Sequence, residues 1–327
     1  MRDDYREYLE EKHSAFQTPE SVVSGMVRRA TGEELVSSAK IVRGNDNEVH
    51  QIATGGGLEY IVRIHRGGEV DLHAEAVCIQ EYRAAGAPVP AVHLVDLAEH
   101  DGEQIEFMVM DRAPGRPLSE LAPDLGPEDW RQAGNAAGAA LGRMHAVRAG
   151  GFYHRDANGN WDFPDWPSVM ASTIEGRSAD AAWIRQVGFS DGELAFMARM
   201  VEVYRDEFDC PEPVLCHGDF LPEHIFVDED LNVTAVIDFG MCQGAHPIHD
   251  FAVLAMTDTG LTPGLVLEGY PRREWVVDRF QLRLYLHKLT LDMGFLAHHV
   301  RIGHYAEIPE NARSLRETLE YLRRERA

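Results

Sequence analysis

The chain has few cysteines and no long hydrophobic run. Its four cysteines, Cys78, Cys210, Cys216 and Cys242, form no CxxC pair among the 327 residues, so we expect neither a structural zinc site nor a framework of disulfides. No stretch approaches the roughly 20 apolar residues of a membrane-spanning helix. The charged start, MRDDYREYLEEKH, lacks the apolar core of a signal peptide. These absences predict a cytoplasmic protein without a membrane partner.

Basic residues are also few relative to acidic ones. Lysine and arginine total 31 against 54 aspartates and glutamates, which gives a formal net charge of −23. Because nucleic-acid backbones are bound by basic surfaces, we expect no nucleic-acid partner. The negative charge would attract a cationic small substrate over a long range, but it is equally consistent with a role in solubility.

Hydrophobic residues still make up 44% of the chain, which is enough for it to fold. Residues 1–38 have a helical pattern, with a helix start at Thr18-Pro19-Glu20. The next segment predicts strands at 39–42, 48–53, 59–64, 91–97 and 105–111 and one helix at 71–85. The break Ala113-Pro-Gly-Arg-Pro117 is the predicted domain boundary, dividing residues 1–112 from residues 113–327.

Beyond this boundary the pattern is mainly helical. Helices are predicted at 127–147, 167–185, 191–208, 249–257, 272–298 and 309–326, with short strands around 214, 225–227 and 233–237. An irregular, aromatic-rich loop is expected over 150–167. The pattern as a whole predicts an α+β chain with a small antiparallel-sheet N-terminal lobe and a mainly helical C-terminal lobe.

The most informative stretch is Cys216-His-Gly-Asp-Phe-Leu-Pro-Glu-His-Ile-Phe-Val227, followed by Val236-Ile-Asp-Phe-Gly240. It places His224 five residues and Asp238 nineteen residues after Asp219. This spacing is typical of a phosphoryl-transfer site, in which one acid orients and deprotonates a hydroxyl and the other two residues hold magnesium on the phosphates of a nucleotide. We therefore predict Asp219 as the catalytic base and His224 and Asp238 as metal ligands.

Two residues are predicted to support this site. Asp250 opens a helix behind it and is expected to accept hydrogen bonds from the catalytic loop, in which His217 lies. Each motif taken alone is also consistent with a simple turn or a core histidine. The spacing of the whole set is what favours catalysis.

In the strand lobe, Arg63 lies in an otherwise apolar strand and Glu75 lies on the inward stripe of the next helix. Opposite charges that both point inward are costly unless they pair, so we predict an ion pair that directs Arg63 toward nucleotide phosphates. A surface arginine at a sheet edge is the alternative.

The turn Gly44-Asn45-Asp-Asn47 is a candidate loop over the phosphates, where small residues let backbone N–H groups approach. A plain hairpin turn is the equally open alternative. The backbone at Asp111 and Ala113, just after an apolar strand, is expected to bind the adenine ring.

With these residues in view, the chain resembles the aminoglycoside phosphotransferase family, small-molecule relatives of the protein kinases. The most specific parts are His217-Gly-Asp219 with His224, Ile237-Asp-Phe-Gly240, and Asp250. The resemblance implies a bilobal protein-kinase-like fold, with a nucleotide in the cleft between the lobes. It also implies transfer of the γ-phosphate of ATP or GTP, with Mg²⁺, to a hydroxyl of an antibiotic or metabolite.

Three positions depart from the family pattern. His224 stands where asparagine is usual, and imidazole is a softer ligand than magnesium prefers. Arg63 stands where many members have lysine, and arginine binds phosphate in a fork. Phe239-Gly240 follows Asp238, as in protein kinases, where many macrolide-type relatives have tryptophan. The aromatic insert around Trp161 resembles the hygromycin-type branch.

The acceptor is expected to be a small molecule with a hydroxyl, and an aminoglycoside is the first hypothesis. Candidate substrate-contacting residues are Glu223, Trp161, Trp166, Asp258 and Asp292. A macrolide or nucleoside antibiotic, or a metabolite such as choline, homoserine or a fructosamine, remains an alternative acceptor. A pseudokinase that binds nucleotide as a regulator is the alternative from another class. Both a monomer and a homodimer are consistent with the sequence.

Overall fold

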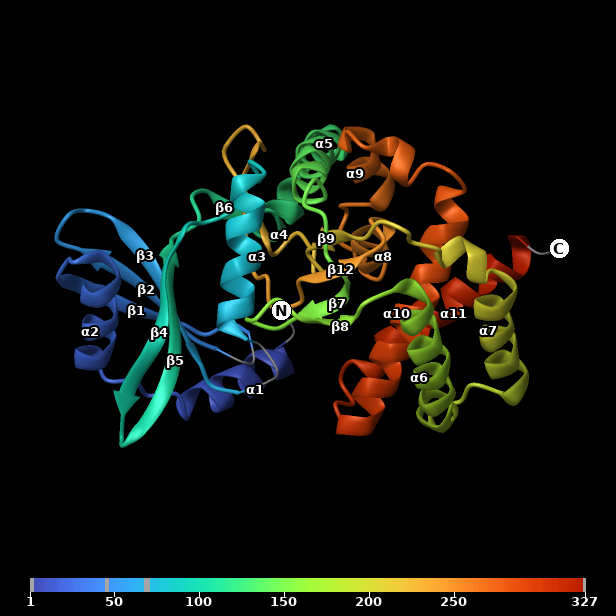
Figure 1. Ribbon diagram of the computed structural model, residues 1–327, viewed down its shortest axis with the longest axis horizontal. Coiled ribbons are helices and arrows are strands. Elements are labelled where there is room, and N and C mark those ends of the chain that lie inside the picture. Colours follow the sequence, from blue (N-terminus) through green and yellow to red (C-terminus); the bar gives the residue numbers. More distant parts are fainter. Residues whose placement is uncertain (1–2, 45–46, 68–70, 326–327) are drawn as a thin grey trace.

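The computed structural model describes residues 3–44, 47–67 and 71–325 and consists of two parts (Figure 1). The first part is built on a five-stranded antiparallel sheet with the order β1-β2-β3-β5-β4. Its strands are β1 (Leu35–Ile41), β2 (Asn47–Thr54), β3 (Glu59–His65), β4 (Val92–His100) and β5 (Glu103–Asp111).

Helices cover both faces of this sheet (Figure 1). On one face α2 (Glu20–Thr31) packs its apolar stripe against residues that include Val62. On the other face α3 (Leu72–Ala84) packs against residues that include Ile61. Because side chains alternate along a strand, Arg63 lies on the same face as Ile61, toward α3, as predicted.

The N-terminal helices end earlier than predicted. α1 (Asp3–Ser14) precedes α2, but β1 begins at Leu35 and pairs with β2, so the prediction of a helical pattern through residue 38 is wrong in its last part. Gly32 ends α2 with φ of +76°, a left-handed conformation that glycine adopts without steric cost.

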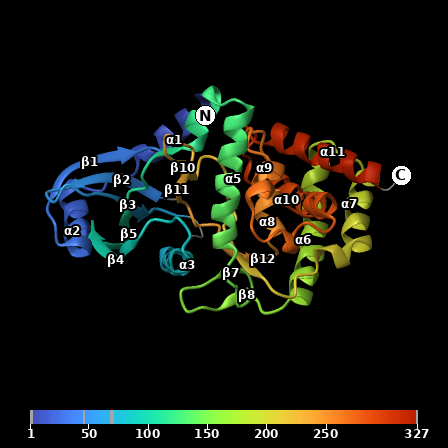
Figure 2. The same cartoon turned by 90° about the horizontal axis from the view of Figure 1, so that it is seen from above.

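The second part is mainly helical, and most of it lies on the other side of α5 from the sheet (Figures 1 and 2). Its helices are α4 (Leu118–Leu121), α5 (Pro127–Met144), α6 (Trp166–Gln186), α7 (Asp191–Val203), α8 (Ile248–Leu254), α9 (Pro263–Gly269), α10 (Phe280–Ile302) and α11 (Ile308–Glu325). α10 is its central helix and packs against α6, α8 and α11. Within the described ranges, no helix combines the length and apolar character needed to cross a bilayer.

Two small sheets accompany these helices and include the strands next to the predicted catalytic residues. One has the order β11-β10-β6, with β10 (Ile225–Val227), β11 (Val233–Val236) and β6 (Arg116–Pro117). The other has the order β8-β7-β12-β9, with β7 (Phe152–Arg155), β8 (Trp161–Phe163), β9 (Val214–Cys216) and β12 (Gln243–Ala245). Together with the helices they confirm the predicted α+β class.

Two predictions for this part need correction. The segment 150–167, expected to be an irregular loop, contains the hairpin β7–β8, and Trp161 packs on the backbone of Gly151. The helix predicted at 272–298 starts only at Phe280, because residues 273–275 form a 3₁₀ turn and Arg279 has a left-handed backbone with φ of +49°.

Candidate active site

The predicted catalytic loop follows β9 and is held by one of its own residues, His217. The Nε2–H of His217 donates to the carbonyl of Ile237 at 2.9 Å, and its Nδ1 accepts from the backbone N–H of Asp219 at 3.1 Å. Burial lowers the pKa of His217 to about 4, so the ring is neutral, as these two roles require. Gly218 has φ of +81°, and a Cβ there would lie 2.0 Å from the carbonyl oxygen of Met241. Only glycine fits this turn without displacing the backbone after Asp238.

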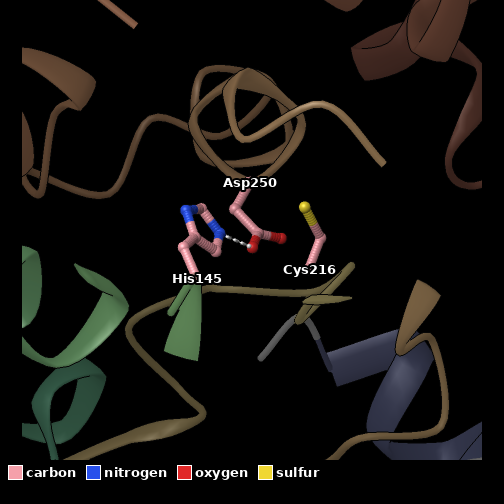
Figure 3. Close-up of side chains that lie close together, drawn as sticks. All are labelled: His145, Cys216 and Asp250. Atoms are coloured by element: carbon pink, nitrogen blue, oxygen red, sulfur yellow. Dashed lines mark hydrogen bonds and ion pairs between the residues drawn. The ribbon is translucent and has the colours of Figure 1, made fainter. Parts of the chain in front are cut away.

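Asp250 in α8 anchors the same loop from behind. Its Oδ2 accepts from the backbone N–H of His217 at 2.9 Å, and its Oδ1 accepts from that of Gly218 at 2.8 Å. The buried His145, at the end of α5, donates from Nε2 to Asp250 Oδ2 at 2.9 Å (Figure 3). Its other ring nitrogen, Nδ1, accepts from the hydroxyl of Tyr270 at 2.9 Å. The predicted hydrogen bonding of Asp250 to the loop is therefore present.

His145 and Tyr270 were not singled out from the sequence. In the sequence, His145 follows Met144 on the apolar stripe of a predicted helix. A histidine at such a position is usually a core residue without a catalytic role. Its partner Asp250 lies more than a hundred residues later in the chain, so the network could not be inferred from local sequence.

The buried cluster of His145, Cys216 and Asp250 has donor atoms within 4.8 Å of one another (Figure 3). Its nitrogen and oxygen atoms are already used in hydrogen bonds, as described above. Burial also raises the pKa of the Cys216 thiol well above its usual range, which keeps it protonated. The cluster is therefore a hydrogen-bonded anchor for the loop, and its occupied nitrogen and oxygen atoms and protonated thiol do not fit a metal ion.

The three residues predicted to carry the chemistry lie together, and we refer to Asp219, His224 and Asp238 as the triad. The imidazole of His224 lies between the two acids, with Nδ1 3.4 Å from Asp219 Oδ2 and Nε2 3.6 Å from Asp238 Oδ2. Its Nδ1 also contacts the carbonyl oxygen of Asp219 at 2.8 Å. The side chains of the two acids are 34% and 50% exposed, so both remain open to solvent and to a ligand.

The charges of the triad shift its pKa values. Burial raises the pKa of Asp219 to about 6, although the adjacent imidazole opposes the shift. For His224, burial lowers the pKa, but the two carboxylates outweigh this and the net pKa is raised. For Asp238, desolvation raises the pKa, but the charges of Arg63 and His224 outweigh it and the net pKa is lowered. Asp219 is thus the better proton acceptor, and Asp238 stays ionised.

The predicted pairing of Arg63 with Glu75 is present. Arg63 Nη1 donates to Glu75 Oε1, and Arg63 Nη2 lies 3.9 Å from Asp238 Oδ1. Glu75 Oε1 also accepts from the backbone N–H of Phe239 at 3.3 Å, and its Oε2 is buried without a hydrogen-bond partner among the described residues. β3, α3 and the segment after β11 are therefore joined beside the triad.

The remaining predicted nucleotide-binding residues lie on the sheet side. Gly44 occupies the β1–β2 turn with φ of +73°, and its carbonyl accepts from His13. Asn45 lies outside the described residues. Asn47 begins β2. Asp111, at the end of β5, accepts from the backbone N–H of Ala91 and from His93. Ala113 is buried two residues further on.

The predicted substrate residues are not gathered in one place. Glu223 is exposed beside the triad and acts on the pKa of Asp219. Trp161 stacks over Arg155, and Trp166 packs on Phe152. Asp258 is exposed.

Asp292 cannot face a ligand. It is fully buried, and its oxygens accept from Lys288, Ser314 and Thr318 between α10 and α11. The prediction that it contacts substrate is therefore wrong. The prediction relied only on the position of Asp292 in its helix. In the structure the side chain points toward α11 and balances the charge of the buried Lys288.

Two surface cavities each include one predicted site residue in their lining, Asp111 in one and Trp166 in the other. One, of about 410 Å³, is at the junction of the two parts and is lined by residues that include Tyr60, Asp111 and Ala235. The other, of about 760 Å³, is lined by residues that include Trp166 and Glu212. None of the three triad residues lines either cavity.

Comparison with known proteins identifies the fold and the family. The profile of the family described as "Phosphotransferase enzyme family" (APH) matches residues 38–283. Among solved structures, aminoglycoside phosphotransferase APH(4)-Ia superposes with a TM-score of 0.67 at 17% identity, covering 93% of this chain and 99% of that one. Amicoumacin kinase hAmiN superposes with a TM-score of 0.64 at 16% identity, covering 95% and 96%. A protein assigned as a fructosamine-3-kinase, from Thermobifida fusca, gives 0.62 at 19% identity, covering 91% and 100%.

A search of curated protein sequences gave no match. The solved structures show a bilobal protein-kinase-like fold, and the family profile defines the class of protein as a phosphotransferase. The chain belongs to the phosphotransferase enzyme family and is a phosphotransferase.

Proposed function

We propose that this enzyme transfers the γ-phosphate of ATP or GTP to a hydroxyl group of a sugar-containing antibiotic, with an aminoglycoside of the hygromycin type as the first candidate. The observation that carries the proposal is the triad. Two acids and an imidazole from separate segments converge within 3.4 and 3.6 Å, which is the arrangement that positioning and charge neutralisation require in phosphoryl transfer.

In this proposal Asp219 receives and orients the acceptor hydroxyl. Its raised pKa suits a group that takes a proton near neutral pH. The carbonyl contact to His224 and the backbone bond to His217 hold it in place. Asp250 and His145 act through the loop and are positioning residues.

The site also fits a divalent cation. Asp238 offers an ionised, half-exposed carboxylate, a hard oxygen ligand that leaves room for water and phosphate. His224 Nε2 lies on the same side and is the second candidate ligand. A bound Mg²⁺ would supply neutralisation of charge on the transferring phosphoryl group. APH(4)-Ia has been solved with AMP-PNP and hygromycin B, and hAmiN with AMP-PNP and Ca²⁺.

The nucleotide is proposed to lie between the two parts of the chain. Arg63, held by Glu75 and 3.9 Å from Asp238, would meet its phosphates. Gly44, Asn45 and Asn47 would cover the phosphates, and the backbone at Asp111 and Ala113 would meet the base. This assigns nucleotide binding to residues 1–112 and catalysis to residues 113–327, in a cytoplasmic enzyme with access to nucleoside triphosphates.

An aminoglycoside is favoured as acceptor by charge. The chain carries a net charge of −23, and the exposed Glu223 beside the triad offers a carboxylate to a polycation. Asp258 is a more distant candidate, and Trp161 and Trp166 would form an aromatic wall for the acceptor. The solved complex of APH(4)-Ia with hygromycin B also supports an aminoglycoside as the first candidate acceptor.

The first test is Asp219→Asn, which keeps shape and removes the base. We expect kcat to fall by about 10²- to 10⁴-fold, with nucleotide binding measured by calorimetry unchanged. Glu229→Gln, an exposed carboxylate in the turn after β10, is the matched control for loss of one negative charge. Turnover of Asp219→Asn at the wild-type rate would exclude the proposed role.

The second test identifies the acceptor. ADP and GDP release would be measured with hygromycin B, other aminoglycosides, a macrolide, a nucleoside antibiotic, choline, homoserine and a fructosamine. We expect the aminoglycosides to give the highest kcat/KM. A higher value for a neutral acceptor would replace the aminoglycoside assignment while keeping the chemistry.

A further inference from the structure

Two of the four cysteines meet where three elements join. Cys78 lies in α3, and Cys242 lies in the turn after Asp238-Phe239-Gly240, just before β12. Each thiol acts on the pKa of the other, and the sulfur of Cys242 lies 3.4 Å from the hydroxyl of Tyr82, one turn after Cys78 in α3. The two residues are 4% and 7% exposed, so the pair lies just beneath the surface and only a small reagent can reach it.

A cation lies against Cys78. Arg155 of β7 points Nη2 at the Cys78 sulfur at 3.8 Å, while its Nη1 donates to Glu81 of α3 at 3.0 Å. The guanidinium is also stacked over Trp161, with 5.3 Å between its carbon and the ring centroid. The hairpin β7–β8 thus presents a fixed positive charge to one sulfur of the pair.

The two sulfurs have different electrostatic surroundings. Interaction with the thiol of Cys242 lowers the pKa of Cys78, burial opposes this, and Arg155 adds to it. Burial raises the pKa of Cys242 well above its usual range, and its sulfur contacts the hydroxyl of Tyr82 at 3.4 Å. A thiolate is the reactive form of cysteine, so Cys78 is suited to attack and Cys242 to resolve. Burial raises the pKa of the other two cysteines, with Cys210 at about 12.

We infer that Cys78 and Cys242 form a reversible disulfide site that is oxidised by a small hydroperoxide. The thiolate of Cys78 attacks one peroxide oxygen, the O–O bond breaks, and the departing alkoxide or hydroxide takes a proton. Cys242 then loses its proton and attacks the sulfenic sulfur, so that the S–S bond forms, the S–O bond breaks and water leaves. Two thiols and one hydroperoxide give one disulfide, one alcohol or water, and one water.

This link would join the two segments that hold the charges of the candidate active site. Glu75 lies one turn before Cys78 in α3, and Asp238 lies four residues before Cys242. Glu75 already accepts from the backbone N–H of Phe239. A covalent bond would fix α3 to this segment and hold both in one arrangement, and we expect turnover to fall as a result. This consequence rests on the proposed function, whereas the disulfide itself does not.

The experiment uses the full chain in reduced form, treated with hydrogen peroxide and then alkylated. Trypsin leaves Cys210, Cys216 and Cys242 in a single peptide, residues 206–272, so a second cleavage at acidic residues is needed before mass spectrometry. We expect a crosslinked peptide that joins Cys78 to Cys242 and disappears after treatment with dithiothreitol. Cys78→Ser and Cys242→Ser should each abolish it, and Cys210→Ser should leave it intact.

Arg155 provides a test of mechanism. Arg155→Leu should slow formation of the crosslink by about tenfold, because less of Cys78 is ionised, and Arg155→Lys should restore most of the rate. Circular dichroism would establish that each variant is folded. Oxidation that stops at a sulfinic acid on Cys78, crosslinks to Cys210 or Cys216 instead, or equal rates in the Leu and Lys variants would overturn the inference. If peroxide gives no crosslink between Cys78 and Cys242 while the enzyme still turns over, the disulfide inference fails and the proposed function stands.

Discussion

At the scale of single residues, His224 is the member of the triad whose role the structure leaves between two alternatives. Its imidazole contacts both acids of the triad, at 3.4 and 3.6 Å. Two roles are compatible with that place: a ligand for a divalent cation through Nε2, or a cation that balances the two carboxylates. The raised pKa of His224 shows that the acids favour its protonated form, and a metal ligand must be neutral.

The substitution His224→Asn separates these roles. An amide oxygen is a harder ligand than imidazole, and imidazole suits manganese better than magnesium. If His224 is a ligand, the ratio of turnover with Mn²⁺ to turnover with Mg²⁺ should fall by about tenfold in the variant, with the wild-type ratio measured under the same conditions. An unchanged ratio, together with reduced turnover for both metals, would leave His224 as a charge-balancing residue only.

At the scale of elements, the catalytic loop depends on one close approach to the segment after β11. A Cβ at Gly218 would lie 2.0 Å from the carbonyl oxygen of Met241, and the φ of +81° is strained for any other residue. Gly218→Ala should therefore lower the unfolding free energy by about 3 kcal/mol and reduce kcat, since Asp219 is the next residue. The measurement is chemical denaturation together with steady-state kinetics.

A glycine on α6 provides the matched control. Gly176 lies inside this helix, and a Cβ added there would have open space around it, with no described atom beyond the local helix backbone within 4 Å. Gly176→Ala should leave kcat unchanged and raise the unfolding free energy by about 0.5–1 kcal/mol through helix propensity. If Gly218→Ala behaves like Gly176→Ala, the loop is not held by this contact.

The same elements show what the sequence could predict. Most strands of the first part were predicted because glycine corners and alternating apolar residues are local signals, but the first four residues of β1 were predicted as helical. The bounds of β10 were predicted residue for residue. The grouping of Asp219, His224 and Asp238 was predicted because their spacing in the sequence is a local signal, although Asp238 lies in a separate segment after β11. The hairpin β7–β8 was missed because its order depends on tertiary contacts, with Trp161 on Gly151 and Arg155 on Glu81. His145 was missed for the same reason, since its partners come from α8 and from the residue after α9.

At the scale of the whole molecule, several buried histidines make stability depend on pH. Burial lowers the pKa of His217 to about 4 and that of His246 to about 3. Each is neutral in the folded chain, whereas in the unfolded chain it binds a proton below about pH 6.5. Between these values the unfolded state holds more protons, so the unfolding free energy falls as the pH drops from about 6.5 toward the folded pKa.

The variant His246→Asn isolates one of these groups. His246 Nδ1 accepts from the backbone N–H of Ile248 at 3.1 Å at the start of α8, and an asparagine oxygen can take that hydrogen bond without titrating. Each such histidine should contribute a slope of about 1.4 kcal/mol per pH unit below pH 6.5. The unfolding free energy of His246→Asn, measured in urea at pH 7, 6 and 5, should therefore fall less steeply than that of the wild type by about this amount.

His73→Asn, on the exposed N-terminal turn of α3, controls for the loss of a surface histidine. Equal slopes for His246→Asn and the wild type would mean that His246 is not buried as a neutral group. The acid sensitivity would then have to come from carboxylates such as Asp250. The pKa of Asp250 is lowered to about 2, because hydrogen bonding and nearby charge outweigh its burial.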